Sequence, residues 1–120
     1  MIGRLSGFAL ECPDPAALAG FYAELTGAAV SYTSDDWVSL GAGDGFDLSF
    51  QRSADYRAPA WPDPCSSMQY HLHVKVADLD VAQSAVVELG ATPFPDQPSP
   101  DTCRVMADPV GHVFCLVPQR

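Results

Sequence analysis

Two histidines, His71 and His73, lie in the part of the chain that is richest in side chains able to do chemistry. Imidazole acts as a general acid or base near neutral pH and is the commonest protein ligand for metals such as zinc. Around them, in residues 70–76, apolar and polar residues alternate with the period of a strand that has one apolar and one polar face. We therefore expect both histidines on the polar face of one strand, facing a ligand or a metal. Two alternatives stay open: a buried His71 hydrogen-bonded to a neighbouring strand, and a His73 without a role.

A second alternating stretch, residues 46–51, predicts a strand with a polar and an apolar face. Its polar residues, which would line a pocket and orient a ligand by hydrogen bonds, are Asp47, Ser49 and Gln51. If Asp47 is buried without a nearby cation its pKa should rise, which would suit a general acid or base. The alternative is an ordinary solvated face of an antiparallel sheet.

Three further side chains are candidates for ligand contact. The indole of Trp37 and the guanidinium of Arg104 would grip a planar or anionic ligand, and the Cys115 thiol is a soft metal ligand once deprotonated. The alternatives are packing of Trp37 at a dimer interface, an ion pair of Arg104 with an acidic neighbour such as Asp108, and Cys115 as a small packed residue. The sequence contains no Ser-His-Asp arrangement, phosphate loop or nucleotide fingerprint.

Composition narrows the classes of partner. A net charge of −9 with only six Lys and Arg argues against nucleic acid and leaves a neutral or cationic small molecule as the easier ligand. No apolar run is long enough to span a bilayer and the N-terminus does not resemble a signal peptide, so we expect a soluble, cytoplasmic protein without membrane contact. The four cysteines form no C-x-x-C pair and are expected as reduced thiols; they are Cys12, Cys65, Cys103 and Cys115.

The elements that position these residues follow the same plan in both halves of the chain. Asp14 is placed to cap a helix that begins at Pro15, and Gly27 suits the position after its end. Asp78 and Gly90 take the same places around a second helix. We expect strands over residues 3–12, 29–33, 37–40, 46–51, 69–76, 91–94, 103–107 and 112–117.

The two halves indicate an internal repeat. Aligning Asp14 with Asp78 brings Glu-Leu-Thr-Gly-Ala at 24–28 beside Glu-Leu-Gly-Ala at 88–91, which a repeat explains better than chance. One helix followed by a run of strands favours an α+β fold of two βαβββ modules. We expect a single domain over residues 1–120 that comprises module one (1–53), a proline-rich connector (54–68) anchored by packing of Trp61, and module two (69–120).

Three motifs occur in this frame: Asp-Pro-x-x-Leu-x-x-Phe-Tyr at 14–22, Trp-Pro-Asp-Pro at 61–64, and Asp-Pro-Val-Gly-His-x-Phe at 108–114 with Cys-Leu after it. Together with the paired modules they resemble the vicinal oxygen chelate superfamily of glyoxalases, bleomycin-resistance proteins and extradiol dioxygenases, and its small bacterial glyoxalase-like branch. The resemblance implies that the modules form a cupped, mostly antiparallel sheet with the ligand site in the cup. It also implies that two chains often form a homodimer.

Metal-dependent members of that superfamily hold one divalent ion with ligands from the first and last strands of each module. Carried onto this chain, the four places are Gly7, Asp47, His71 and Cys115. Gly7 offers no side chain, and the other three combine a hard oxygen, a borderline nitrogen and a soft sulfur. We therefore expect no metal cofactor, although a three-ligand site for zinc, nickel, manganese or iron stays open.

These observations lead to three hypotheses for function. The leading one is a protein of the glyoxalase and bleomycin-resistance type that binds a small organic molecule in the cup without a metal. The alternatives are a divalent-metal-dependent lyase, isomerase or dioxygenase, and a dimeric interaction module with a vestigial pocket. Whether the protein is an enzyme stays open at this point.

Overall fold

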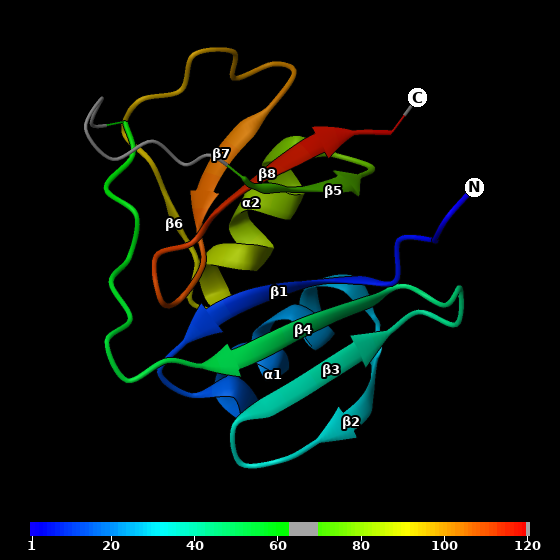
Figure 1. Ribbon diagram of the computed structural model, residues 1–120. Helices are drawn as coiled ribbons and strands as arrows, with labels where there is room; N and C mark the ends of the chain where they lie inside the picture. Colours follow the sequence, from blue (N-terminus) through cyan, green and yellow to red (C-terminus); the bar gives the residue numbers. More distant parts are fainter. Residues whose placement is uncertain (63–69, 120) are drawn as a thin grey trace. The chain divides into compact units, whose positions relative to one another are not determined.

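The computed structural model describes residues 1–62 and 70–119, which fall into two compact units, residues 1–56 and 57–120. Within the described residues each unit contains one helix and one four-stranded sheet (Figure 1). The α+β fold of two βαβββ modules is confirmed. In the part described, no helix is long and apolar enough to cross a membrane.

The first unit begins with β1 (Gly7–Cys12) and α1 (Pro15–Thr26) and continues with β2 (Ala29–Thr33), β3 (Trp37–Gly41) and β4 (Asp47–Arg52). Its sheet has the order β1-β4-β3-β2, with β1 parallel to β4 and the other pairs antiparallel. The helix begins as predicted, because an Asp14 carboxylate oxygen accepts a hydrogen bond from the Ala17 N–H at 3.3 Å. It ends at Gly27, whose φ of 75° is the left-handed conformation that glycine adopts without cost.

The second unit repeats this plan with β5 (Leu72–Val76), α2 (Leu79–Glu88), β6 (Thr92–Pro93), β7 (Arg104–Ala107) and β8 (Val113–Pro118). The sheet order is β5-β8-β7-β6, and β5 is parallel to β8. Asp78 caps α2 by accepting from the Val81 N–H at 3.0 Å. In both sheets two of the three pairs are antiparallel, in agreement with the predicted mostly antiparallel arrangement.

Several strand boundaries differ from the prediction. The first strand begins at Gly7 and not at residue 3, because its partner β4 begins at Asp47 and leaves the earlier residues without a ladder to join. His71 lies immediately before β5 and not within it. The start of the predicted strand 69–76 and the second part of the predicted connector, residues 63–68, lie outside the described residues.

One face of each sheet packs on the helix of its own unit. In the first unit the ring of Tyr22 from α1 stacks on Phe50 of β4 at a centroid distance of 5.4 Å. In the second unit Val86 of α2 is buried together with Phe114 and Leu116 of β8. The helix of each unit does not cover the opposite face of its sheet, and this free face is where side chains can contact a ligand.

Candidate functional site

The free face of the first sheet carries the predicted polar set. In the β-ladder Asp47 lies opposite Gly7 and Gly41, which places all three on this face. By the same register Ser49 lies opposite Ser39, and Gln51 opposite Trp37. The predicted alternation is thus present. That these residues contact a ligand remains a prediction.

A chain of hydrogen bonds fixes the centre of this face. The Trp37 Nε1–H donates to Ser39 Oγ at 2.8 Å, and Ser39 Oγ lies 2.7 Å from Ser49 Oγ. Both serines are only 5% exposed, so the bonds between them are shielded from water. The indole ring is therefore held in one orientation before any ligand arrives.

Beside this chain lies a hollow of about 400 Å³, within the range of small-molecule pockets. Its lining is formed by Ser6, Gly7, Phe8, Ala9, Trp37, Ser39, Asp47 and Ser49. Two glycines lie next to Asp47. A Cβ at Gly7 would lie 2.7 Å from the Asp47 carbonyl oxygen, so glycine is needed there, whereas a Cβ at Gly41 would lie 2.9 Å from Asp47 Oδ1 and would only displace that carboxylate. Gln51 shares the face but does not line the hollow.

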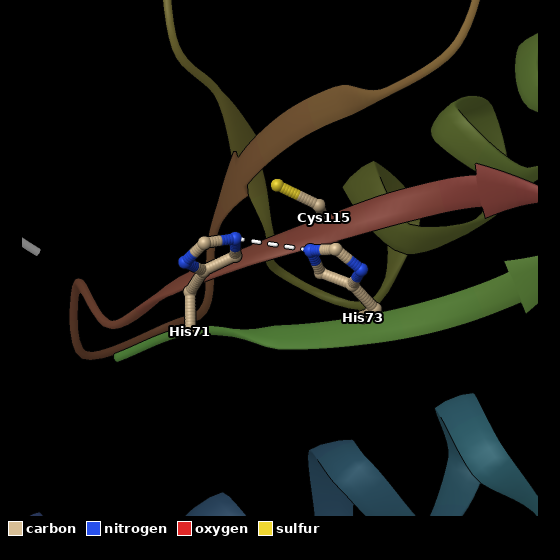
Figure 2. Close-up of side chains that lie close together, drawn as sticks. All are labelled: His71, His73 and Cys115. Atoms are coloured by element: carbon tan, nitrogen blue, oxygen red, sulfur yellow. Dashed lines mark hydrogen bonds between the residues drawn. The ribbon is translucent and has the colours of Figure 1, made fainter. Parts of the chain in front are cut away.

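In the second unit His71, His73 and Cys115 come together on the free face of the sheet (Figure 2). His73 lies opposite Cys115 in the parallel β5–β8 ladder, and His71 projects on the same side. The Nε2 atoms of the two imidazoles are 3.0 Å apart, within hydrogen-bond distance. Partial burial and the neighbouring charge of His73 lower the pKa of His71 below its usual range.

Cys115 is 3% exposed and packs with Val105 and Val113. Burial, followed by a hydrogen bond and electrostatic interaction with Cys103, raises its pKa to about 12. In the absence of a metal it is a thiol at neutral pH, as expected for a small packed residue. Trp61, which contacts Phe94 edge to face at a centroid distance of 5.1 Å, packs against the same cluster and confirms the predicted packing role.

A model of the glyoxalase-like domain family matches residues 7–117. The chain belongs to this family. A comparison with curated proteins finds no significant match in sequence.

Solved structures of low sequence identity share the fold. A possible glyoxalase from Bacillus cereus has a TM-score of 0.71 to this glyoxalase-like protein, with 17% identity over 98% of this chain and 99% of that one. A glyoxalase/bleomycin resistance protein/dioxygenase family enzyme from Burkholderia phytofirmans has a TM-score of 0.73, with 18% identity over 97% and 98%. The fosfomycin-resistance protein FosX from Listeria monocytogenes, complexed with Mn(II), has a TM-score of 0.73 with 17% identity over 98% and 90%.

The four positions that the family resemblance implies for a metal do not fit one in this glyoxalase-like protein. Gly7 supplies no donor atom, and the 2.7 Å approach of a Cβ there to the Asp47 carbonyl oxygen leaves no room for a ligating side chain. The remaining three differ in hardness, from the oxygen of Asp47 to the sulfur of Cys115. These four positions therefore do not supply a complete ligand set for one ion.

Arg104 lies on the other face of its sheet, opposite Leu116 in the β7–β8 ladder and toward α2. Its guanidinium pairs with Asp80 at 2.9 Å and donates to Gln83 Oε1 at 2.9 Å. The alternative of an ion pair with an acidic neighbour is therefore confirmed, but the partner is Asp80; the Asp108 carboxylate accepts instead from the backbone N–H groups of Val110 and His112 in the turn before β8. We leave Arg104 out of the proposed site.

Sequence reasoning did not single out Ser39, Cys103 or Lys75. The position of Ser39 could have been predicted, because it stands two residues after Trp37 in a predicted strand and therefore shares the face of Trp37. Lys75 follows His73 on the same face and lines a second hollow of about 390 Å³, together with Thr102, Val117 and Pro118. The contact of Cys103 with Cys115 depends on the register between β7 and β8, which no local pattern encodes.

Proposed function

We propose that this glyoxalase-like protein binds a small neutral or cationic organic molecule against the polar face of the first unit, without a metal in the contact. The observation that carries the proposal is the hollow of about 400 Å³ beside the hydrogen-bonded chain of Trp37, Ser39 and Ser49. A site that is ordered in advance spends less free energy on fixing its side chains when a ligand binds.

Each wall of the hollow suggests a feature of the ligand. The indole N–H of Trp37 is already bonded to Ser39, so its ring face is the part left for an aromatic group or a cation. Asp47 is half-buried and would pair with a positive group or accept hydrogen bonds. The glycines at 7 and 41 let a ligand approach this carboxylate closely.

The relatives support a small organic ligand, and the overall charge bears on the sign of its charge. The solved structures of this fold include proteins named for resistance to bleomycin and to fosfomycin, both small molecules. The net charge of −9 favours approach of cations over anions. On the second unit, His71, His73 and Lys75 would make polar contacts with a ligand of their own sheet face.

The test is a binding screen that reads Trp37 directly. The chain has two tryptophans, so Trp61→Phe leaves Trp37 as the single indole emitter. We expect at least one compound from a panel of cationic antibiotics and aromatic metabolites to change Trp37 emission and to raise the melting temperature, since a ligand that binds only the folded state stabilises it. A panel that changes neither would favour the dimeric interaction module.

A matched pair of variants then locates the contact. Asp47→Asn should weaken binding of a cationic hit by about tenfold or more, or roughly 1.4 kcal/mol. Asp55→Asn removes the same charge from an exposed site outside the hollow and should leave the affinity unchanged. Equal losses in both variants would contradict binding at the hollow and indicate attraction to the overall charge.

The second candidate function, a metal-dependent lyase, isomerase or dioxygenase, is favoured by the grouping of His71, His73 and Cys115. It predicts glutathione-hemithioacetal isomerisation or ring cleavage that appears only after a divalent metal is added. Absence of both activities in metal-loaded protein would reject these two reactions.

A further inference from the structure

We infer that the second unit holds a binding site for the anionic oxygen group of a small organic acid, with Lys75 as its charged contact. The site is the second hollow, of about 390 Å³, which is lined by His73, Lys75, Thr102, Val117 and Pro118. The inference rests on the proposed function in one respect, that this sheet face contacts a ligand, and it adds the class of that ligand. It is independent of the hollow in the first unit, because the two hollows share no lining residue.

Lys75 is the only lysine of the chain, and its charge is available to a ligand. The residue is exposed, and no carboxylate among the described residues forms an ion pair with it. By contrast, the guanidinium of Arg104 on the other face of the sheet is paired with Asp80 at 2.9 Å. An ammonium group without a carboxylate partner, placed beside a hollow, is a recognition point for an anion.

The sheet face around Lys75 carries no carboxylate at any ladder position that the structure describes. The positions that share this face are His73, Lys75, Thr92, Val105, Ala107, Val113, Cys115 and Val117. The free face of the first sheet, in contrast, carries Asp47 and Glu11. In a chain with a net charge of −9, a face without carboxylates is where an anion meets the least repulsion.

Two further side chains can donate hydrogen bonds to the anion. The Thr102 hydroxyl donates to the Ser99 carbonyl oxygen at 3.3 Å, a long bond that rotation of the hydroxyl would exchange for one to a ligand. The Nε2 atoms of His71 and His73 are 3.0 Å apart, and Figure 2 shows the other ring nitrogen of His73, Nδ1, on the side away from His71. When His73 Nε2 accepts from His71, its Nδ1 carries the proton and can donate it to the anion.

The rest of the lining is apolar and favours an organic acid over an inorganic anion. Val117 and Pro118, at the end of β8, form this part of the hollow. The volume of about 390 Å³ lies within the range of small-molecule pockets and leaves room for more than the anionic group itself. We therefore expect an acid with an apolar body, such as an aromatic carboxylate or phosphonate.

The experiment is an NMR titration of the full-length chain labelled with ¹⁵N-lysine, which gives one backbone amide signal because the chain has one lysine. Benzoate, benzamide and benzamidinium present the same ring as an anion, a neutral molecule and a cation. At constant ionic strength, benzoate should shift the Lys75 signal to saturation and bind at least about tenfold more tightly than benzamide, because a charged acceptor forms the stronger hydrogen bond. The proposal is overturned if neither benzoate nor phenylphosphonate gives a saturable shift, or if benzamidinium binds as tightly as benzoate.

Matched variants, measured by ligand-observed NMR, test the role of the ammonium group. Lys75→Met should weaken benzoate binding by about tenfold or more, whereas Lys75→Arg keeps the charge and should retain most of the affinity. Arg57→Gln removes a charge of the same sign from an exposed site of the second unit outside the hollow, and should bind benzoate as the parent does. Equal losses in Lys75→Met and Arg57→Gln would contradict the proposal and indicate attraction to the overall charge.

The two hollows are tested separately. Asp47→Asn should leave the benzoate affinity unchanged, and a loss as large as in Lys75→Met would contradict an independent second site. Inorganic phosphate that binds as tightly as benzoate would contradict the role of the apolar lining. Saturable benzoate binding without any cationic or neutral ligand for the first unit would reject the proposed function there and support the site at Lys75.

Discussion

At the scale of single residues, the two buried serines of the first unit have a measurable role in stability. Ser49→Ala removes one partner of the 2.7 Å contact with Ser39 and should lower the free energy of unfolding by about 1 kcal/mol. Urea denaturation checks this value. Ser84→Ala, on the exposed side of α2, should change it by less than about 0.5 kcal/mol. A Ser49→Ala protein as stable as the parent would show that the contact contributes nothing.

Because the pKa of Cys115 is raised on folding, the stability of the metal-free protein should fall at high pH. Its pKa rises from 9.0 to about 12 on folding, so above pH 9 the unfolded chain loses this proton first. The stabilisation is fully present below pH 9 and is lost as the pH rises toward 12. Unfolding measured from pH 7 to 11 should therefore show a steeper loss in the parent than in Cys115→Ser. Parallel curves would contradict the raised pKa.

At the scale of elements, much of the framework was predictable because its signals are local. Asp14, Asp78 and Gly27 fix helix ends through bonds that span a few residues, and alternation places Asp47 on the polar face of its strand. The pairing of His73 with Cys115 was not predictable, since it depends on which distant strand lies beside β5 and in which register. The pairing of Arg104 with Asp80 of α2 was not predictable either, because alternation gives a strand two faces but does not say which one the helix covers.

The cap of α2 is the clearest test at this scale. Asp78→Ala removes the acceptor for the Val81 N–H and should cost about 1 kcal/mol of stability, whereas Asp78→Ser keeps an acceptor and should cost less. Chemical denaturation of both variants measures the difference. Equal costs for alanine and serine would show that the cap bond is not what stabilises this helix end.

At the scale of the whole molecule, the family resemblance leads us to propose a homodimer. Light scattering coupled to size-exclusion chromatography should then give twice the chain mass of 12.8 kDa. A monomer at every concentration tested would contradict the proposal. It would also remove the interaction module from the hypotheses for function, because that hypothesis requires association between chains.

The parallel pairing within each unit has a consequence for biogenesis. β5 and β8 are adjacent in space but separated by the helix and two strands in the chain, so their ladder closes a long loop. Contacts of this kind form late and slow the folding reaction. During synthesis both histidines emerge well before Cys115 and have no sulfur beside them until β8 has been made. The grouping of His71, His73 and Cys115 is thus a property of the finished unit, and it exists only after the ladder between β5 and β8 has closed.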